Sequence, residues 1–179
     1  MKPSKQNGVS LIEACAVLAI VSIVAASAIP SLQEMRQAHL IRAVASEIAA
    51  DLQFMRSESV SRNQTLRISF SNVASGQSCY VIHTGPASAC TCEAAGPARC
   101  VGEAQEVKTA HQPSDLRTSV HANVGSMVYA PQHGTTTPGG SIFITGADGR
   151  GVKHVVSLMG RFQTCSPNGT LTGYPRCRS

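Results

Sequence analysis

One apolar run near the N-terminus constrains the fold of this chain more than any other feature. A short polar leader with Lys2 and Lys5 ends at Gly8, and the residues from Val9 to Ile29 are then small or apolar with one exception, Glu13. A helix of about 20 such residues is long enough to span the hydrocarbon core of a bilayer. The sequence therefore predicts a helix that begins in a membrane.

A secretory signal peptide is the main alternative for this segment, and two features argue against it. Ala26-Ser27-Ala28 would suit a signal peptidase, but the apolar run is long for a signal peptide, and an amphipathic helical pattern continues directly from Ser31. A carboxylate in a membrane helix costs roughly 2–3 kcal/mol at the bilayer centre and less near the surface. We therefore expect Glu13 to have a partner of opposite charge.

Gly8 followed by Val9-Ser-Leu-Ile-Glu13 resembles the cleavage and methylation motif of type IV prepilins, with Val9 in place of the usual phenylalanine. The resemblance implies that a prepilin peptidase cuts after Gly8 and N-methylates Val9. Glu13 would then be the fifth residue of the mature chain, and Pro30 would stand where such pilins often carry a proline. It also implies that Glu13 pairs with the new amine of a neighbouring subunit, because a paired charge is tolerable in an apolar bundle and an unpaired one is costly.

The helical pattern continues past Pro30, which should kink the helix or end its membrane part, to about Ser61. Its apolar stripe is Leu32, Met35, Leu40, Val44, Ile48, Leu52 and Met55. Near the end, the residues Arg56-Ser57-Glu58, Val60 and Arg62-Asn63 resemble a signature of the GspH/FimT/FimU group of minor pilins and minor pseudopilins. Without the resemblance, Arg56 and Glu58 would read as a solvated helix face.

From Thr65 the apolar pattern changes to the alternation typical of strands. Candidate strands are Leu66 to Phe70, Tyr80 to Ile82, Gln105 to Ala110, Arg117 to Val124, Ser126 to Ala130, Ser141 to Thr145 and Lys153 to Leu158, with a hairpin turn at 146–151 and an exposed loop at 135–140. As in the family, we expect an α+β pilin fold, in which a long N-terminal helix packs on an antiparallel β-sheet domain. The expected parts are a leader (1–8), a transmembrane and assembly helix (9–30), an amphipathic helical half (31–63) and a β-rich domain (64–179).

Seven cysteines divide by position into one in the membrane helix, Cys15, and six in the β-rich domain, which are Cys79, Cys90, Cys92, Cys100, Cys165 and Cys177. An even number in a domain that faces the periplasm favours three disulfides. Cys165 and Cys177 should pair, because they close a short loop worth roughly 3 kcal/mol by chain entropy. The sequence leaves open how the other four pair, with Cys79 and Cys100 as the expected partners of Cys90 and Cys92.

Zinc is the alternative use of Cys90, Cys92 and Cys100, with His83 or His111 as a fourth ligand. The Cys-x-x-Cys spacing typical of zinc sites is absent, so disulfides are favoured. No glycine-rich phosphate loop, nucleophile elbow or His-x-x-x-His pair is present. We therefore expect neither a cofactor nor catalytic activity.

Positive charge is concentrated toward the C-terminus. From Ala110 onward the basic residues are Arg117, Arg150, Lys153, Arg161, Arg176 and Arg178, against Asp115 and Asp148. Gly160-Arg161-Phe162-Gln163 resembles the Gly-Arg-x-Arg motif of DNA-binding FimT-type proteins, with Gln163 in place of the second arginine. Arg161, Arg150, Lys153, Arg176 and Arg178 are thus candidates for phosphate contacts, and Phe162 for base stacking. The alternative is that Arg161 is an ordinary surface charge and Phe162 faces the core.

The resemblance implies a minor type IV pilin that helps to initiate or cap pilus assembly. Its partners would be major and minor pilins, the prepilin peptidase and the bacterial inner membrane, with the β-rich domain in the periplasm before incorporation into the pilus at the cell surface. Two alternatives remain open: a DNA-binding minor pilin that acts in DNA uptake, and a minor pseudopilin of a type II secretion system.

Overall fold

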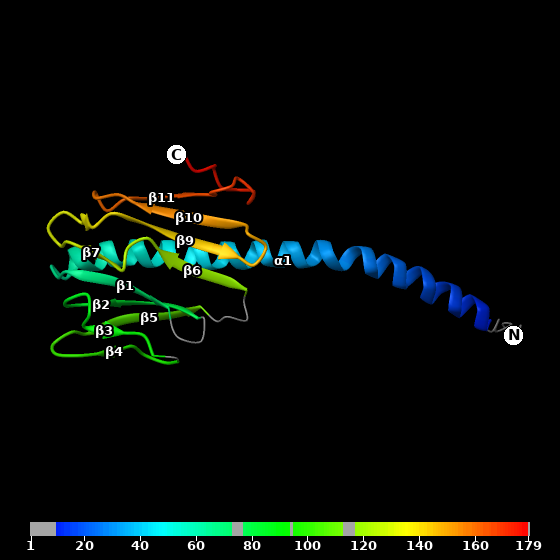
Figure 1. Ribbon diagram of the computed structural model, residues 1–179, viewed down its shortest axis with the longest axis horizontal. Helices are drawn as coiled ribbons and strands as arrows, with labels where there is room; N and C mark the ends of the chain where they lie inside the picture. The colour runs from blue at the N-terminus through cyan, green and yellow to red at the C-terminus, as the bar shows by residue number, and fades with distance from the viewer. Residues whose placement is uncertain (1–9, 73–76, 94, 113–116, 179) are drawn as a thin grey trace, which may run out of the picture. The chain divides into compact units, whose positions relative to one another are not determined.

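The structure is a computed structural model that describes residues 10–72, 77–93, 95–112 and 117–178 (Figure 1). It opens with a single helix, α1, which runs from Leu11 to Ser61. The chain forms two compact units, and the boundary between them falls within α1, after Arg36. The helix continues through position 30, so Pro30 does not end it.

Helix α1 ends where the sequence predicts, and the backbone shows why. Asn63 adopts a left-handed conformation (φ 50°), which asparagine tolerates better than most residues. The N–H of Asn63 donates to the Val60 carbonyl and the N–H of Gln64 to the Ser59 carbonyl. These two bonds form a Schellman motif, which satisfies carbonyl groups that the last helical turn leaves unpaired.

The second unit, from Gln37 onward, contains the rest of α1, two larger antiparallel sheets and a small hairpin (Figure 1). One sheet has the strand order β5-β2-β1-β7-β8, the other has the order β11-β10-β9-β6, and β3 pairs with β4. The strands are β1 (Leu66–Asn72), β2 (Ser78–His83), β3 (Cys90–Thr91), β4 (Arg99–Cys100), β5 (Glu106–Gln112), β6 (Thr118–Ala122), β7 (Ser126–Tyr129), β8 (Thr136–Thr137), β9 (Gly140–Gly146), β10 (Gly151–Val156) and β11 (Phe162–Cys165).

The hydrophobic core lies between α1 and the inner faces of both sheets. Its helical members recur every three or four residues, as one face of a helix requires. They are Ala38, Ile41, Val44, Ala45, Ile48, Leu52 and Met55. The strands contribute the alternating residues that point inward, such as Ile68, Ile142 and Ile144. Because every residue of this core lies between Ala38 and Leu171, the second unit holds a complete core of its own.

Three residues of the predicted apolar stripe, Leu32, Met35 and Leu40, are outside this core, and Leu40 is only partly buried. Leu32 and Met35 are more than half exposed and belong to the first unit, in which the described residues have no buried partner. Ile41 and Ala45, which the sequence did not single out, are buried instead. The prediction was wrong for Leu32 and Met35 because the apolar periodicity of α1 continues across the boundary between the two units. The periodicity therefore does not mark the residue at which the core begins.

The predicted strands correspond to β1, β2, β5, β6, β7, β9 and β10, and the hairpin between β9 and β10 is confirmed. The short strands β3, β4 and β8 and the last strand β11 were missed. The loop predicted to be exposed at 135–140 contains β8, and Thr136 is buried because it pairs with Tyr129 of β7. A two-residue strand gives too short a pattern for periodicity to reveal.

Candidate functional site: the apolar helix and the basic C-terminal sheet

The first half of α1 presents apolar side chains to solvent. Leu11 and Ile12 are both more than 80% exposed, and large apolar residues remain exposed as far as Met35. Within α1, Glu13 is the only charged residue before Glu34. The helix is long and apolar enough to cross a membrane, with a mean hydropathy of 2.4 in its most apolar window. A segment of this kind is stable only if lipid or other apolar helices cover it.

Glu13 lies in the first turn of α1. Its backbone N–H points at the hydroxyl of Ser10, which precedes the helix, at 3.4 Å. A negative charge in a first turn is favoured by the helix dipole, so the carboxylate suits this position before any partner arrives. Pro30 lies within the helix, whereas Gly8 and Val9 lie outside the described residues.

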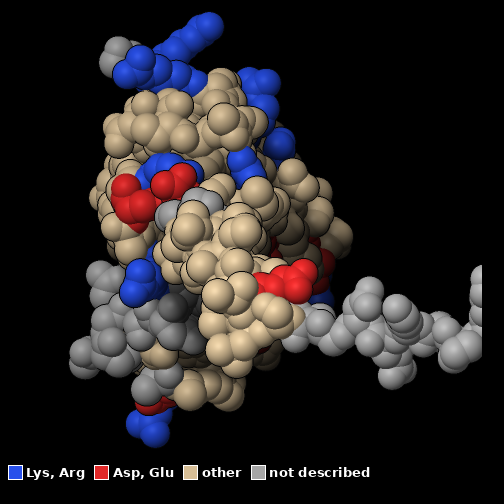
Figure 2. All heavy atoms as spheres, turned by 90° about the vertical axis from the view of Figure 1, so that its right-hand side faces the viewer, with Lys and Arg blue, Asp and Glu red and all other residues tan. Residues whose placement is uncertain are grey.

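The second group of candidate residues lies on and around the four-stranded C-terminal sheet. From Arg117 to Arg178 the chain carries six basic residues and a single acidic one, Asp148. Asp148 forms a salt bridge with Arg150, whose Nε donates to Asp148 Oδ2 at 2.7 Å. Burial by itself would raise the pKa of Asp148, but the hydrogen bonds and charge of Arg150 hold this pKa below its ordinary value. Figure 2 shows Lys and Arg gathered at the top of the molecule, the side on which Figure 1 places β11 and the C-terminus.

The sheet brings only some of these cations together. Lys153 of β10 stands opposite Cys165 of β11, and Ser166 forms a bridge with Arg176. Arg150 precedes the start of β10, beside these residues, and Arg178 follows the Cys165–Cys177 disulfide. Arg161 lies apart from them, in the turn at the far end of the β10–β11 hairpin.

The turn that contains Arg161 has a structural reason for its glycine. Gly160 adopts a left-handed conformation (φ 70°), and a Cβ there would overlap the carbonyl oxygen of Gly134. Arg56 lies against the same loop, because a Cβ on Gly134 would come within 3.2 Å of Arg56 Cγ. The helix-end signature and the C-terminal motif thus converge on one loop. This explains Gly160 and the position of Arg56 through packing, whereas the Arg161 side chain is exposed.

Phe162 does not offer a stacking face. It packs against the core, and its ring meets the buried His154 ring edge-on at 5.7 Å. His154 ties the sheet to α1, with Nε2 2.9 Å from the Ala45 carbonyl oxygen and Nδ1 2.9 Å from Thr164 Oγ1. Burial lowers the pKa of His154, so the imidazole is neutral and joins two elements of the core.

An aromatic row on the outer face of the same sheet was missed by sequence reasoning. The rings of His121 and Phe143 stack at 4.8 Å, and Lys153 Nζ lies 5.2 Å from the centre of the Phe143 ring. The three residues are direct cross-strand neighbours on β6, β9 and β10. The only signal in the sequence was their alternation with buried neighbours, and strand register is needed to bring them together.

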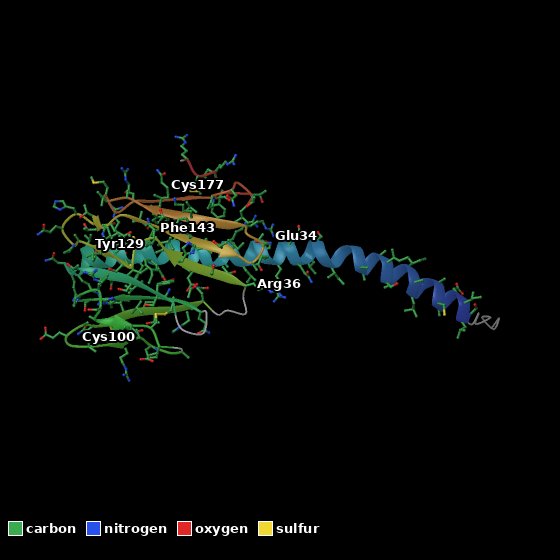
Figure 3. All side chains as sticks on the ribbon, in the orientation of Figure 1. Glu34, Arg36, Cys100, Tyr129, Phe143 and Cys177 are labelled. Atoms are coloured by element: carbon green, nitrogen blue, oxygen red, sulfur yellow. A yellow bond between two sulfur atoms is a disulfide. The ribbon has the colours of Figure 1, made fainter. Side chains whose placement is uncertain are left out.

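All six cysteines of the second unit form disulfides, Cys79–Cys92, Cys90–Cys100 and Cys165–Cys177. The last is the pair that the sequence favoured. Cys90 meets Cys100 because the two are register partners of β3 and β4, and Cys92 then reaches Cys79 of β2. The three cysteines considered as zinc ligands, Cys90, Cys92 and Cys100, are thus all engaged in disulfides. The β3–β4 hairpin and the C-terminal loop lie on opposite sides of the domain, as Cys100 and Cys177 show in Figure 3.

The fold and the helix-end signature can now be compared with known proteins. The family model described as type II transport protein GspH matches residues 44–160. The chain belongs to the GspH family. This family consists of structural pilin-like proteins rather than enzymes. A crystal structure of the type IV minor pilin FimU from Pseudomonas aeruginosa (strain PAO1) has 21% sequence identity and a TM-score of 0.48, and the match covers 69% of this chain and 86% of that one. No curated protein sequence matches the chain.

A GspH-family subunit assembles with other pilin-like subunits, and two features of this chain concern such assembly. The first is the exposed apolar helix with its lone carboxylate, Glu13. The second is the basic sheet, which belongs to a separate compact unit. Membership of the family fixes neither the kind of fibre nor what the basic sheet contacts.

Proposed function

We propose that this chain is a minor pilin that helps to initiate or cap a type IV pilus. The observation that carries the proposal is the exposed apolar segment from Leu11 to Met35, in which Glu13 is the only charge before Glu34. Such a segment is held in the inner membrane before assembly and among the helices of other pilins afterwards. The domain from residue 64 onward then faces the periplasm and later the cell surface.

The proposal includes processing at the N-terminus. A prepilin peptidase removes residues 1–8 by cutting after Gly8 and methylates the amine of Val9. Residues 9–30 then serve as the transmembrane and assembly helix, and residues 31–63 join it to the β-rich domain. The Glu13 carboxylate of one subunit pairs with the Val9 amine of its neighbour, because two charges brought into an apolar bundle are tolerated only as a pair.

The test is a Glu13→Gln variant in the natural host, with Glu34→Gln as the matched control on the same helix. We expect Glu13→Gln to be cut normally but to lose the fibre, since the substitution removes the charge and keeps the shape. Immunoblots of processed and unprocessed chain and electron microscopy of sheared fibres report the two effects separately. Normal fibre numbers in Glu13→Gln would refute the proposed pairing.

A secretion pseudopilin would use the same helix, so the host phenotype must separate the two systems. Deletion of the gene should abolish pili if the subunit belongs to a type IV pilus. Loss of protein secretion with normal pili would instead place the subunit in a type II secretion system. In that case Glu13→Gln should lower protein secretion and leave the number of pili normal, because Glu13 would then pair with a neighbouring subunit in the pseudopilus and not in the pilus.

A second candidate function is the capture of DNA, favoured by the excess of cations on the C-terminal sheet. Arg161, Arg176 and Arg178 are exposed, and Lys153 and Arg150 are half-buried beside the C-terminal segment. Binding through phosphates would weaken steeply with salt. The test is DNA binding by the full chain in detergent across a salt series, beside a triple Arg→Ala variant at 161, 176 and 178. Absence of binding at low salt would leave only the role in fibre assembly.

A further inference from the structure

The outer face of the C-terminal sheet carries aromatic rings and a cation, and a cavity adjoins its edge at β6. The row formed by His121, Phe143 and Lys153 crosses three strands, β6, β9 and β10. His121 is exposed, whereas Phe143 has a ring on one side and the Lys153 ammonium over it. The row is therefore a short stack, and its outer end is His121.

A cavity of about 160 Å³ adjoins this end of the stack. One side of the cavity is formed by β6 and the loop that follows it, with His121, Asn123 and Gly125, and the other side by Phe70 of β1 in the other sheet. Phe143 lies on the β9 side of His121, so the cavity faces the side of β6 away from Phe143. The volume equals about five liquid waters, enough for one planar ring.

The cavity also has a polar group in a fixed orientation. Asn123 Oδ1 accepts the Ser141 backbone N–H at 2.7 Å, which turns the amide NH₂ group toward other partners. That amide donates to carbonyl oxygens, which the ring of thymine carries on its edge. Among the described residues of the surrounding sheet and its turns, Asp148 is the one carboxylate, and Arg150 engages it.

We propose that this cavity and row form a stacking site for a base of single-stranded nucleic acid. A base inserted in the cavity stacks on His121 on the side away from Phe143 and so extends the row by one ring. Asn123 donates to the edge of the base, and the adjoining phosphates run across the sheet toward Lys153. A paired base in a duplex has both faces covered by its neighbours, so the site selects single strands. The inference rests on the second proposed function, nucleic-acid binding by this sheet, and adds the subsite and the preference for single strands.

The stacking site can be blocked without changing any charge. A Cβ on Gly125 meets nothing within 4 Å, and Gly125 lines the cavity, so Gly125→Leu places a side chain in the open space. Gly125→Ala leaves most of the space open and is the matched control. A second variant, His121→Ser with Phe143→Leu, removes both rings from a surface that contributes nothing to the core.

The experiment measures fluorescence anisotropy of labelled oligothymidylate, of an abasic oligonucleotide of the same length and of a duplex, with the full chain in detergent. We expect oligothymidylate to bind at least fivefold more tightly than the abasic strand, because stacking of one base contributes about five- to hundredfold in affinity. Gly125→Leu and the double variant should lose this advantage, whereas Gly125→Ala should keep it. Thermal unfolding of each variant checks that the fold is intact.

The outcomes separate this inference from the function on which it rests. Equal binding of all three probes, unaffected by Gly125→Leu but lost in the triple arginine variant, would overturn the stacking site and support phosphate binding. No binding of any probe at low salt would overturn both. Preferential binding of single strands that survives in both stacking variants would also overturn the site, since the bases would then be held elsewhere.

Discussion

Replacement of Tyr80 by phenylalanine should reveal how strongly a buried carboxylate joins α1 to the five-stranded sheet. Asp51 of α1 is buried and accepts two short hydrogen bonds, from the Tyr80 hydroxyl at 2.7 Å and from Lys108 Nζ at 2.7 Å. Burial and the neighbouring carboxylate raise the pKa of Tyr80 well above its ordinary value, so the hydroxyl keeps its proton and donates. The ring is almost fully buried and stays in place in the variant, which isolates the hydrogen bond from packing.

The expected cost follows from this geometry. A hydrogen bond to a charged group contributes about 1.5–3 kcal/mol, and the carboxylate keeps only Lys108 when the hydroxyl is gone. The free energy of unfolding should therefore fall by about 2 kcal/mol, measured by urea denaturation monitored by circular dichroism, with an unchanged denaturant slope. For a domain of this size the midpoint of thermal unfolding should fall by roughly 5–10 °C.

Tyr129→Phe is the matched control, because Tyr129 is as deeply buried as Tyr80 and its hydroxyl neighbour is Thr136 rather than a carboxylate. The control should cost less than about 1 kcal/mol. Equal losses in the two variants would refute the importance of the charged acceptor. A double-mutant cycle with Asp51→Asn adds a second check, since side chains in direct contact should show a coupling energy above about 0.5 kcal/mol.

Three further outcomes can be measured on the same domain. Replacing Cys165 and Cys177 by serine should lower the free energy of unfolding by about 3 kcal/mol through loop entropy, and peptide mapping without reduction should link the two cysteines in the natural chain. Burial lowers the pKa of His154, so the unfolded chain takes up the proton first; stability should be complete above about pH 6.5 and decrease as the pH falls below it, less steeply in His154→Gln. Gly160→Ala should cost about 1–3 kcal/mol from its left-handed backbone alone, whereas Gly125→Ala should be nearly neutral in urea denaturation.

The sequence predicts the elements of this fold better than it predicts their burial. Alternation located most strands, and the end of the helical pattern located the end of α1 near Ser61, because both signals are local. Strand β2 shows the limit, since all six of its residues are buried. One face of β2 packs against the core, and the other lies under the β3–β4 hairpin, where Val81 contacts Cys79 and Cys90. Because the segment that covers the outer face of β2 comes from another part of the chain, the alternation of residues within β2 does not reveal that this face is buried.

The candidate sites show the same division between local and long-range information. Glu13 could be identified from the sequence alone, because what distinguishes it is that its neighbours in sequence are apolar. Lys153 was identified by its charge, but its contact with Phe143 depends on the register of β9 and β10. Phe162 was considered for stacking because it follows Arg161, and the alternation of β11 turns it into the core instead.

The convergence of Arg56 and Gly160 on Gly134 changes how the C-terminal motif should be interpreted. A glycine is required at position 160 whether or not a ligand binds, because its backbone touches the Gly134 loop and its φ is positive. The glycine is therefore no evidence for DNA binding, and Arg161 is the only exposed cation of the motif, with Gln163 in place of a second. If this sheet binds nucleic acid, most of the positive charge must come from Lys153, Arg176 and Arg178, at the other end of the β10–β11 hairpin. Arg161→Ala should then weaken nucleic-acid binding less than the double variant Arg176→Ala and Arg178→Ala does. If a salt titration shows instead that Arg161→Ala weakens binding more, the motif that contains Arg161 is the binding centre.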